Sequence, residues 1–257
     1  SGPTRGTGYA YSTNNGVAWS NIRVPDRRSG FPALDMLQGA TAGTIISNHN
    51  DPGTGLQTLT YVDSPPGGLA FSELGPTVSL AGDEPIWPMV AGTANGAIVV
   101  SAARQGAGTT HNTRTTDFIS WSPWSQAPLP NGSAGGYGTH ANGTGRVGVL
   151  VNTSFGGSEG IYWWESTDNG ATWPTTTTQI YGATRIVGPD TFSFYLGSDF
   201  VYSGNTVYAA ISEVNIGLNA PTDSAQIAFW SQATGFRVAA SKVNTLGVSP
   251  SENRPML

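Results

Sequence analysis

The chain has 257 residues, and only 11% of them are charged, whereas roughly a quarter are charged in an ordinary globular domain. A formal net charge of −5 and a single lysine, Lys242, exclude the basic surface that nucleic acid requires. The absence of cysteine excludes disulfides, thiolate catalysis and cysteine-based metal sites. No apolar run approaches the ~18 residues of a membrane-spanning helix. The chain is rich in Gly and Pro, but eight Trp, nine Tyr and nine Phe favour a folded protein over a disordered one.

Strand-like segments recur along the chain in a fixed order. Each unit begins with a first strand, continues with a β-branched run opened by a turn glycine, and ends with an alternating or aromatic-rich run. No window of eleven or more residues shows the apolar spacing of a helix with a suitable cap. The sequence therefore predicts an all-β protein. The predicted first strands lie at 31–37, 86–90, 136–141 and 192–200.

A short motif follows the aromatic-rich run of each unit. Residues 12–19 (STNNGVAW) and 166–173 (STDNGATW) are identical at five of eight positions. Weaker copies begin at Ser64, Thr115 and Ser231, so that the successive steps are 52, 51, 51 and 65 residues. Four short strands at a period near fifty are typical of a β-propeller blade.

The repeat predicts one β-propeller domain over 1–257. Its four complete blades are expected at about 29–78, 79–131, 132–188 and 189–245. Residues 1–28 and 246–257 are expected to share a fifth, split blade, because residues 251–257 resemble the first strand at 84–89. The second strand of that blade is missing, so we expect the chain to be cut inside a blade. A parent propeller of six or more blades is the alternative.

The octapeptide at 166–173 resembles the Asp-box, S/T-x-D-x-G-x-x-W, of the bacterial neuraminidase repeat in sialidase-like propellers. The resemblance implies a structural role, in which the acidic residue accepts turn amides, the glycine adopts an unusual backbone angle and the tryptophan packs beside the strand. Such turns lie on the outer side of a propeller, away from its axis. The matching residues are Ser12, Asn14, Gly16, Trp19, Asp117, Trp121, Ser166, Asp168, Gly170 and Trp173.

A sialidase needs more than these turns. The resemblance implies three arginines that clamp a substrate carboxylate, a Tyr–Glu nucleophile pair and an aspartic acid. Residues 22–25 (IRVP) are similar to the family's first arginine motif, but they follow an Asp-box and end a blade. We therefore do not expect sialidase activity from this chain alone.

The chemistry of a propeller is normally found at the mouth of its central channel, on the first strands and the loops before them. Asp35 and Glu84 occupy corresponding places in successive units and are the candidate acid and nucleophile or base of glycoside hydrolysis. The structural alternative is that polar residues of the first strands only form hydrogen bonds around a water-filled channel. Candidate substrate-binding residues are Trp87, His140, Tyr195 and Arg254.

Metal and cofactor chemistry find little support in the sequence. The three histidines are too widely separated for a zinc site. The oxygen-rich turns at 48–51 and 168–170 could hold calcium, but turn chemistry alone explains them. We therefore expect no metal and no cofactor.

Three functions are consistent with these observations. The first is a secreted or cell-surface propeller that binds glycans or an extracellular protein. The second is a sialidase-like glycoside hydrolase, and the third is a structural module of a larger surface or adhesion protein. A propeller fold by itself does not separate them.

Overall fold

Strands and loops account for the whole of the structure, a computed structural model that describes residues 5–39, 42–51, 56–76, 80, 84–104, 108–130, 134–153, 159–216 and 224–243. The described residues contain no helix, as the sequence predicted. Consequently, none of them forms a helix that could span a membrane. Neighbouring strands within each sheet run antiparallel.

Four of the sheets have four or five strands, and each keeps its strands in chain order. The first contains β3 (Ser29–Leu37), β4 (Gly43–Asn50), β5 (Gln57–Asp63) and β6 (Ser72–Pro76). The second contains β7 (Pro85–Gly92), β8 (Ile98–Arg104), β9 (Thr110–Thr115) and β10 (Ser125–Gln126). The third contains β11 (Ala134–Ala141), β12 (Val147–Thr153), β13 (Gly160–Ser166) and β14 (Thr178–Tyr181).

The fourth sheet differs from the four-stranded prediction. It contains β15 (Arg185–Val187), β16 (Asp190–Ser203), β17 (Thr206–Asn215), β18 (Ser224–Ser231) and β19 (Gly235–Val243). The extra strand β15 pairs with the start of β16 through a tight turn at Gly188, whose φ is +60°. At the N-terminus a separate hairpin pairs β1 (Gly8–Tyr11) with β2 (Ser20–Arg23).

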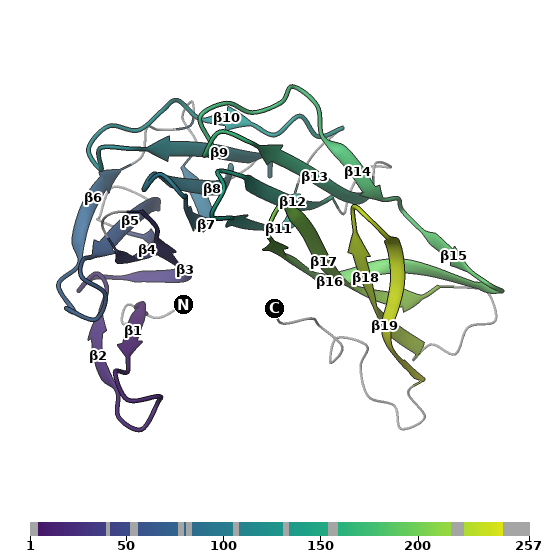
Figure 1. The fold of residues 1–257 in the computed structure, drawn as a ribbon, viewed down its shortest axis with the longest axis horizontal. Helices are drawn as coiled ribbons and strands as arrows, with labels where there is room; N and C mark the ends of the chain where they lie inside the picture. The colour runs from purple at the N-terminus through teal and green to yellow at the C-terminus, as the bar shows by residue number, and fades with distance from the viewer. Residues whose placement is uncertain are drawn as a thin grey trace.

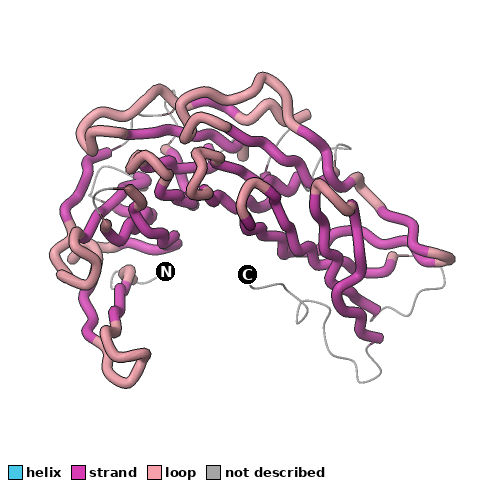
Figure 2. The backbone as a smooth tube through the Cα atoms, in the orientation of Figure 1, coloured by secondary structure: helices cyan, strands magenta, loops and turns pink. Residues whose placement is uncertain are grey.

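The sheets follow one another around an arc, as the blades of a β-propeller do (Figure 1). The tube view shows the same succession of strand layers joined by loops (Figure 2). The strands β3, β7, β11 and β16 contact one another in that order. The chain is thus all β, with antiparallel sheets arranged as propeller blades.

Apolar side chains fill the space between successive sheets. Leu37, Ile45 and Val62 of the first sheet pack against Val90 and Ile98 of the second. Equivalent clusters join the second sheet to the third and the third to the fourth. Because most strand residues face another sheet, few positions need a charge, which explains the low charge of the chain.

Each first strand carries a β-bulge near its beginning. The register shifts between Gly30 and Ala33 in β3 and between Ile86 and Met89 in β7. The shift recurs at the start of β11 and within β16. Bulges redirect side chains out of the regular alternation of a strand.

Candidate functional site

The bulges of β3 and β7 present two large aromatic side chains to solvent. Phe31 and Trp87 have positive φ angles of 50° and 52°, and each precedes a proline. A non-glycine residue in this region costs on the order of 1–3 kcal/mol, and such residues cluster at functional sites. Each ring is nevertheless 48% exposed. The fold therefore exposes two aromatic side chains to solvent on residues with strained backbone angles.

These two rings line one pocket at the start of the first strands. Their centroids are 6.3 Å apart and their planes meet at 72°, an edge-to-face arrangement. The pocket has a volume of about 280 Å³, near the lower end of small-molecule sites. We call it the aromatic pocket. Besides Phe31 and Trp87, its side chains include Arg5, Arg28, His49, Asp51, Leu56 and Ile86.

Arginine side chains supply the positive charge of the aromatic pocket. The guanidinium carbon of Arg5 lies 4.2 Å from the centroid of the Phe31 ring, within the range of a cation–π contact. Arg5 rests against Gly30, where an added Cβ would lie 2.5 Å from the arginine Nε. A glycine at this position thus makes room for the guanidinium. Arg28 forms an ion pair with Asp51, with 2.9 Å between Nη1 and Oδ2.

His49 is the buried polar group of the aromatic pocket. Its side chain is 6% exposed and contacts the Phe31 ring edge to face, with centroids 5.8 Å apart. Burial, together with the positive charge of Arg5, lowers the pKa of His49 to about 4, so the imidazole is neutral at pH 7. Its Nε2 has no hydrogen-bond partner among the described residues. A buried polar atom without a hydrogen-bond partner is uncommon in a folded protein.

Tyr137 of β11 contacts the backbone of the bulge that carries Trp87. Its hydroxyl donates to the carbonyl oxygens of Ile86, at 3.2 Å, and of Trp87. Trp87 lies inside the bulge, between the paired positions Ile86 and Met89. Burial raises the pKa of Tyr137, so the phenol remains a donor. The third blade thereby fixes the bulge that carries Trp87.

The structure does not bring Asp35 and Glu84 together. Asp35 lies near the end of β3, where its Oδ2 accepts a hydrogen bond from the amide of Gly92 at 2.9 Å. Glu84 directly precedes β7, eight residues before Gly92. That spacing corresponds to about 25 Å of extended strand, whereas glycosidase carboxyl pairs are ~5–10 Å apart. The two carboxylates, although they occupy corresponding units, lie at different heights along β7.

The remaining predicted site residues are spread over two blades. His140 of β11 pairs with Asp199 of β16, with 3.0 Å between Nε2 and Oδ1. Burial raises the pKa of Asp35, while the charge of His140 acts to lower it. Tyr195 lies within the bulge of β16 and is half-buried. Arg254 lies outside the described residues.

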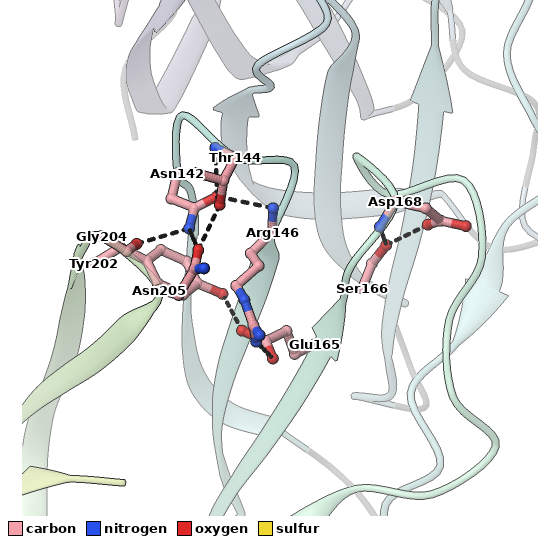
Figure 3. A network of polar contacts seen from close by, with 9 residues as sticks. All are labelled: Asn142, Thr144, Arg146, Glu165, Ser166, Asp168, Tyr202, Gly204 and Asn205. Carbon is pink, nitrogen blue, oxygen red and sulfur yellow. Dashed lines mark hydrogen bonds and ion pairs between the residues drawn. The ribbon is translucent and has the colours of Figure 1, made fainter. Parts of the chain in front are cut away.

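The turn at 166–173 is held by hydrogen bonds within itself. The Ser166 hydroxyl donates to Asp168 at 2.7 Å and accepts from the Gly170 amide at 3.0 Å. Asp168 accepts from the Thr172 amide at 2.9 Å, and the Trp173 indole donates to the Gly170 carbonyl at 3.2 Å. The hydroxyl of Ser166 and the carboxylate of Asp168 are therefore engaged in hydrogen bonds within the turn. Figure 3 shows Ser166 and Asp168 beside the polar contacts of the neighbouring strands.

The N-terminal turn has the same geometry with Asn14 in place of the aspartate. Asn14 Oδ1 accepts from the Ser12 hydroxyl at 3.0 Å and from the Ala18 amide at 2.8 Å. The Gly16 amide donates to Ser12, and the Trp19 indole donates to the Gly16 carbonyl. The side-chain amide oxygen of Asn14 therefore accepts the hydrogen bonds that a carboxylate oxygen of Asp168 accepts in the other turn.

In two further turns an aspartate also accepts backbone amides, but at a different spacing along the chain. The Oδ1 of Asp117 accepts the amides of Ile119 and Ser120, which lower its pKa to about 2, while the Trp121 indole reaches the carbonyl of Leu74. In the first blade the acceptor is Asp63, which binds the amides of residues 67, 69 and 70. This copy of the motif was expected to begin one residue later, at Ser64, so Asp63 was not among the predicted residues.

Phe31, Arg5 and His49 were not among the residues predicted for a site. One signal was available, because the pairs Phe31–Pro32 and Trp87–Pro88 stand at matching places in successive first strands. Arg5 and His49 come from other segments, and only the packing of the blades brings them to the pocket. Their position depends on tertiary structure.

The described residues contain no group of three or more histidine or acidic side chains arranged to hold a metal ion. Residues 48–50, expected in a turn, lie instead at the end of β4. The side-chain Nδ2 of Asn48 donates to the Thr7 hydroxyl and to the carbonyl of Val24. Asp51, directly after the strand, pairs with Arg28, so protein contacts engage these oxygen-rich residues.

No protein-family model matches the chain, and no curated protein is similar to it in sequence. Solved structures resemble it in fold. An ulvan lyase of polysaccharide lyase family PL25 superposes with a TM-score of 0.50 at 10% identity, over 80% of this chain and 54% of the lyase. The likeness is one of fold alone. The Hadza microbial sialidase Hz136 gives a TM-score of 0.49 at 15% identity, over 81% of this chain and 43% of the sialidase. A protein of unknown function from Dyadobacter fermentans gives 0.49 at 13% identity, over 92% and 81%. The chain thus spans about half the length of the lyase and of the sialidase.

Proposed function

We propose that the chain is a glycan-binding β-propeller with turns of the Asp-box type, secreted or displayed at the cell surface. The aromatic pocket is its binding site. The observation that carries the proposal is the pair of strained, exposed rings, Phe31 and Trp87, facing one pocket. A packing role alone would not require either ring to remain in solvent.

The chemistry of the pocket suits a sugar residue. The C–H faces of a sugar ring stack on aromatic rings, and its hydroxyls need donors and acceptors around them. Arg5 and Arg28 supply donors, Asp51 supplies acceptors, and the neutral His49 has an unused nitrogen. A ring bound between Phe31 and Trp87 would have polar groups on more than one side.

Binding to an array of immobilised glycans, followed by calorimetry with the best ligand, tests this proposal. We expect Phe31→Ala and Trp87→Ala each to weaken binding about tenfold, which corresponds to about 1.4 kcal/mol of lost stacking. Trp19→Ala is the matched control, because Trp19 is also exposed but lies on the N-terminal turn away from the pocket. Its affinity should equal that of the unmodified chain.

Two results would contradict the proposal. One is the absence of binding to any glycan by the folded chain. The other is equal binding by the Phe31, Trp87 and control variants. Hydrolysis of the bound glycan, measured as new reducing ends, would favour the glycoside hydrolase instead.

A further inference from the structure

The backbone at Trp87 is held in a conformation that its own sequence does not favour. A residue before proline ordinarily adopts extended backbone, yet Trp87 precedes Pro88 and has a φ of +52°. The indole is half exposed, so packing of the ring itself offsets only part of the strain. A contact from another part of the molecule is needed to keep this residue in its bulge.

The Tyr137 hydroxyl of the third blade makes such a contact on both sides of Trp87. It donates to the carbonyl oxygen of Ile86, at 3.2 Å, and to that of Trp87 itself. These two carbonyls belong to the peptide groups that precede and follow the Trp87 Cα. Because peptide groups are planar, holding both of them fixes the φ and ψ angles of Trp87. The hydroxyl thus determines the direction in which the indole points.

Tyr137 acts on the aromatic pocket from outside it. Ile86 and Trp87 line the pocket, whereas Tyr137 does not. Burial raises the pKa of the Tyr137 phenol, so the hydroxyl keeps its proton and remains a donor. The influence of Tyr137 on a ligand in the pocket therefore passes through the backbone of β7.

The other ring of the pocket is held differently. Tyr137 of β11 corresponds to Pro88 of β7, since each lies four residues before the last residue of its strand. Proline has no hydroxyl with which to reach the bulge of β3. Phe31 is instead covered by the Arg5 guanidinium, 4.2 Å from the ring centroid. Loss of the Tyr137 hydroxyl should therefore free Trp87 and leave Phe31 in place.

We propose that Tyr137 is a positioning residue of the aromatic pocket, which holds the Trp87 indole toward the ligand from the neighbouring blade. Without the hydroxyl, the two peptide groups lose their common donor, and the backbone at Trp87 relaxes toward the extended conformation that a following proline favours. The indole then turns away from the ring of Phe31. The consequence for glycan affinity rests on the proposed function, whereas the hold on the indole does not.

Fluorine NMR of the chain labelled with fluorinated tryptophan tests the hold on the indole without any glycan. The chain has eight tryptophans, and Trp87→Phe identifies the signal of Trp87. In Tyr137→Phe we expect that signal to shift or broaden, while the remaining signals keep their positions and show that the variant is folded. Tyr181→Phe is the matched control, because the Tyr181 hydroxyl also donates to a backbone carbonyl, that of Phe192 at 3.4 Å, but does not line the pocket. An unchanged Trp87 signal in Tyr137→Phe, or an equal change in Tyr181→Phe, would overturn the proposal.

A binding cycle with the best glycan of the array separates positioning from a general loss of stability. Tyr137→Phe should weaken binding about fivefold in the unmodified chain, within the tenfold loss expected for Trp87→Ala. In the Trp87→Ala background the same substitution should leave the affinity unchanged, because the indole that the hydroxyl holds is already gone. An equal loss in both backgrounds would show that the hydroxyl acts by another route and would refute the positioning role. If no glycan binds while the Trp87 signal still moves, the proposed function fails and the positioning role stands.

Discussion

Two buried histidines make the stability of the protein sensitive to pH. His49 and His111 are 6% and 5% exposed, and burial lowers the pKa of each from 6.5 to about 4. The positive charges of Arg5 near His49 and of Arg104 near His111 contribute to these lowered pKa values. Both side chains therefore fold in the uncharged form.

The free energy of unfolding should fall as the pH falls from about 6.5 to 4. In this range the unfolded chain binds protons that the folded chain excludes, so stability rises with pH. Each imidazole should lower the free energy of unfolding by on the order of 3 kcal/mol as the pH falls from 6.5 to 4. Urea unfolding between pH 7 and pH 4.5 measures the slope, and His49→Gln and His111→Gln should each flatten it.

Asp117 provides an internal contrast to the histidines. Its pKa is lowered to about 2, so its stabilising contribution is lost only below about pH 4, outside the histidine range. If the histidine variants kept the full slope above pH 4.5, the loss of stability would come from other groups.

At the level of elements, the two octapeptide turns behave as interchangeable local units. In both turns the third residue accepts an amide four positions on, although one has an amide and the other a carboxylate there. The turn at 166–173 has one further bond, from the Thr172 hydroxyl to the second carboxylate oxygen of Asp168 at 2.7 Å. The acceptor oxygen, and not the charge, is the shared feature. Backbone amides of the turn find their partner in it.

Asp168→Asn should therefore leave stability nearly unchanged, whereas Asp168→Ala should cost about 1–2 kcal/mol by leaving the Thr172 amide without its acceptor. Thermal or urea unfolding of the two variants measures the difference. Asn14→Asp is the reciprocal control and should be close to neutral. If Asp168→Asn proved as destabilising as Asp168→Ala, the negative charge itself would be what stabilises the turn.

Local signals in the sequence were sufficient for most of these elements. Turn glycines, alternating runs and the repeat of the octapeptide predicted the first three strands of each blade, because hairpins depend on neighbouring residues, whereas β15 was not predicted. The positive φ of Phe31 and Trp87 was not predictable, since an aromatic residue before proline ordinarily adopts extended backbone. Asp35 lies on the expected first strand, β3, whereas Glu84 directly precedes β7. Their relative heights were not predictable, because these depend on how one sheet packs on the next.

On the scale of the whole molecule, polar contacts join the blades as well as apolar packing. The Tyr202 hydroxyl of β16 donates to Glu165 of β13 at 2.7 Å, and Arg146 of the third blade binds the other carboxylate oxygen at 2.7 Å (Figure 3). Asn142 also reaches across to the carbonyl of Gly204 at 2.7 Å. Because each blade contacts only its neighbours, such links determine how far unfolding of one blade spreads.

Removing the Tyr202 hydroxyl should loosen both blades that it joins. Tyr202→Phe keeps the ring contacts with Trp163 and Phe200 but leaves Glu165 with one partner fewer. We expect a loss of about 1–2 kcal/mol in the free energy of unfolding. Hydrogen exchange should become faster in β12 and β13 as well as in β16 and β17, because the shared bond holds the two sheets together. Tyr208→Phe is a suitable control, since Tyr208 stacks on Phe229 within the fourth blade. Faster exchange confined to β16 and β17 would show that the two blades open independently.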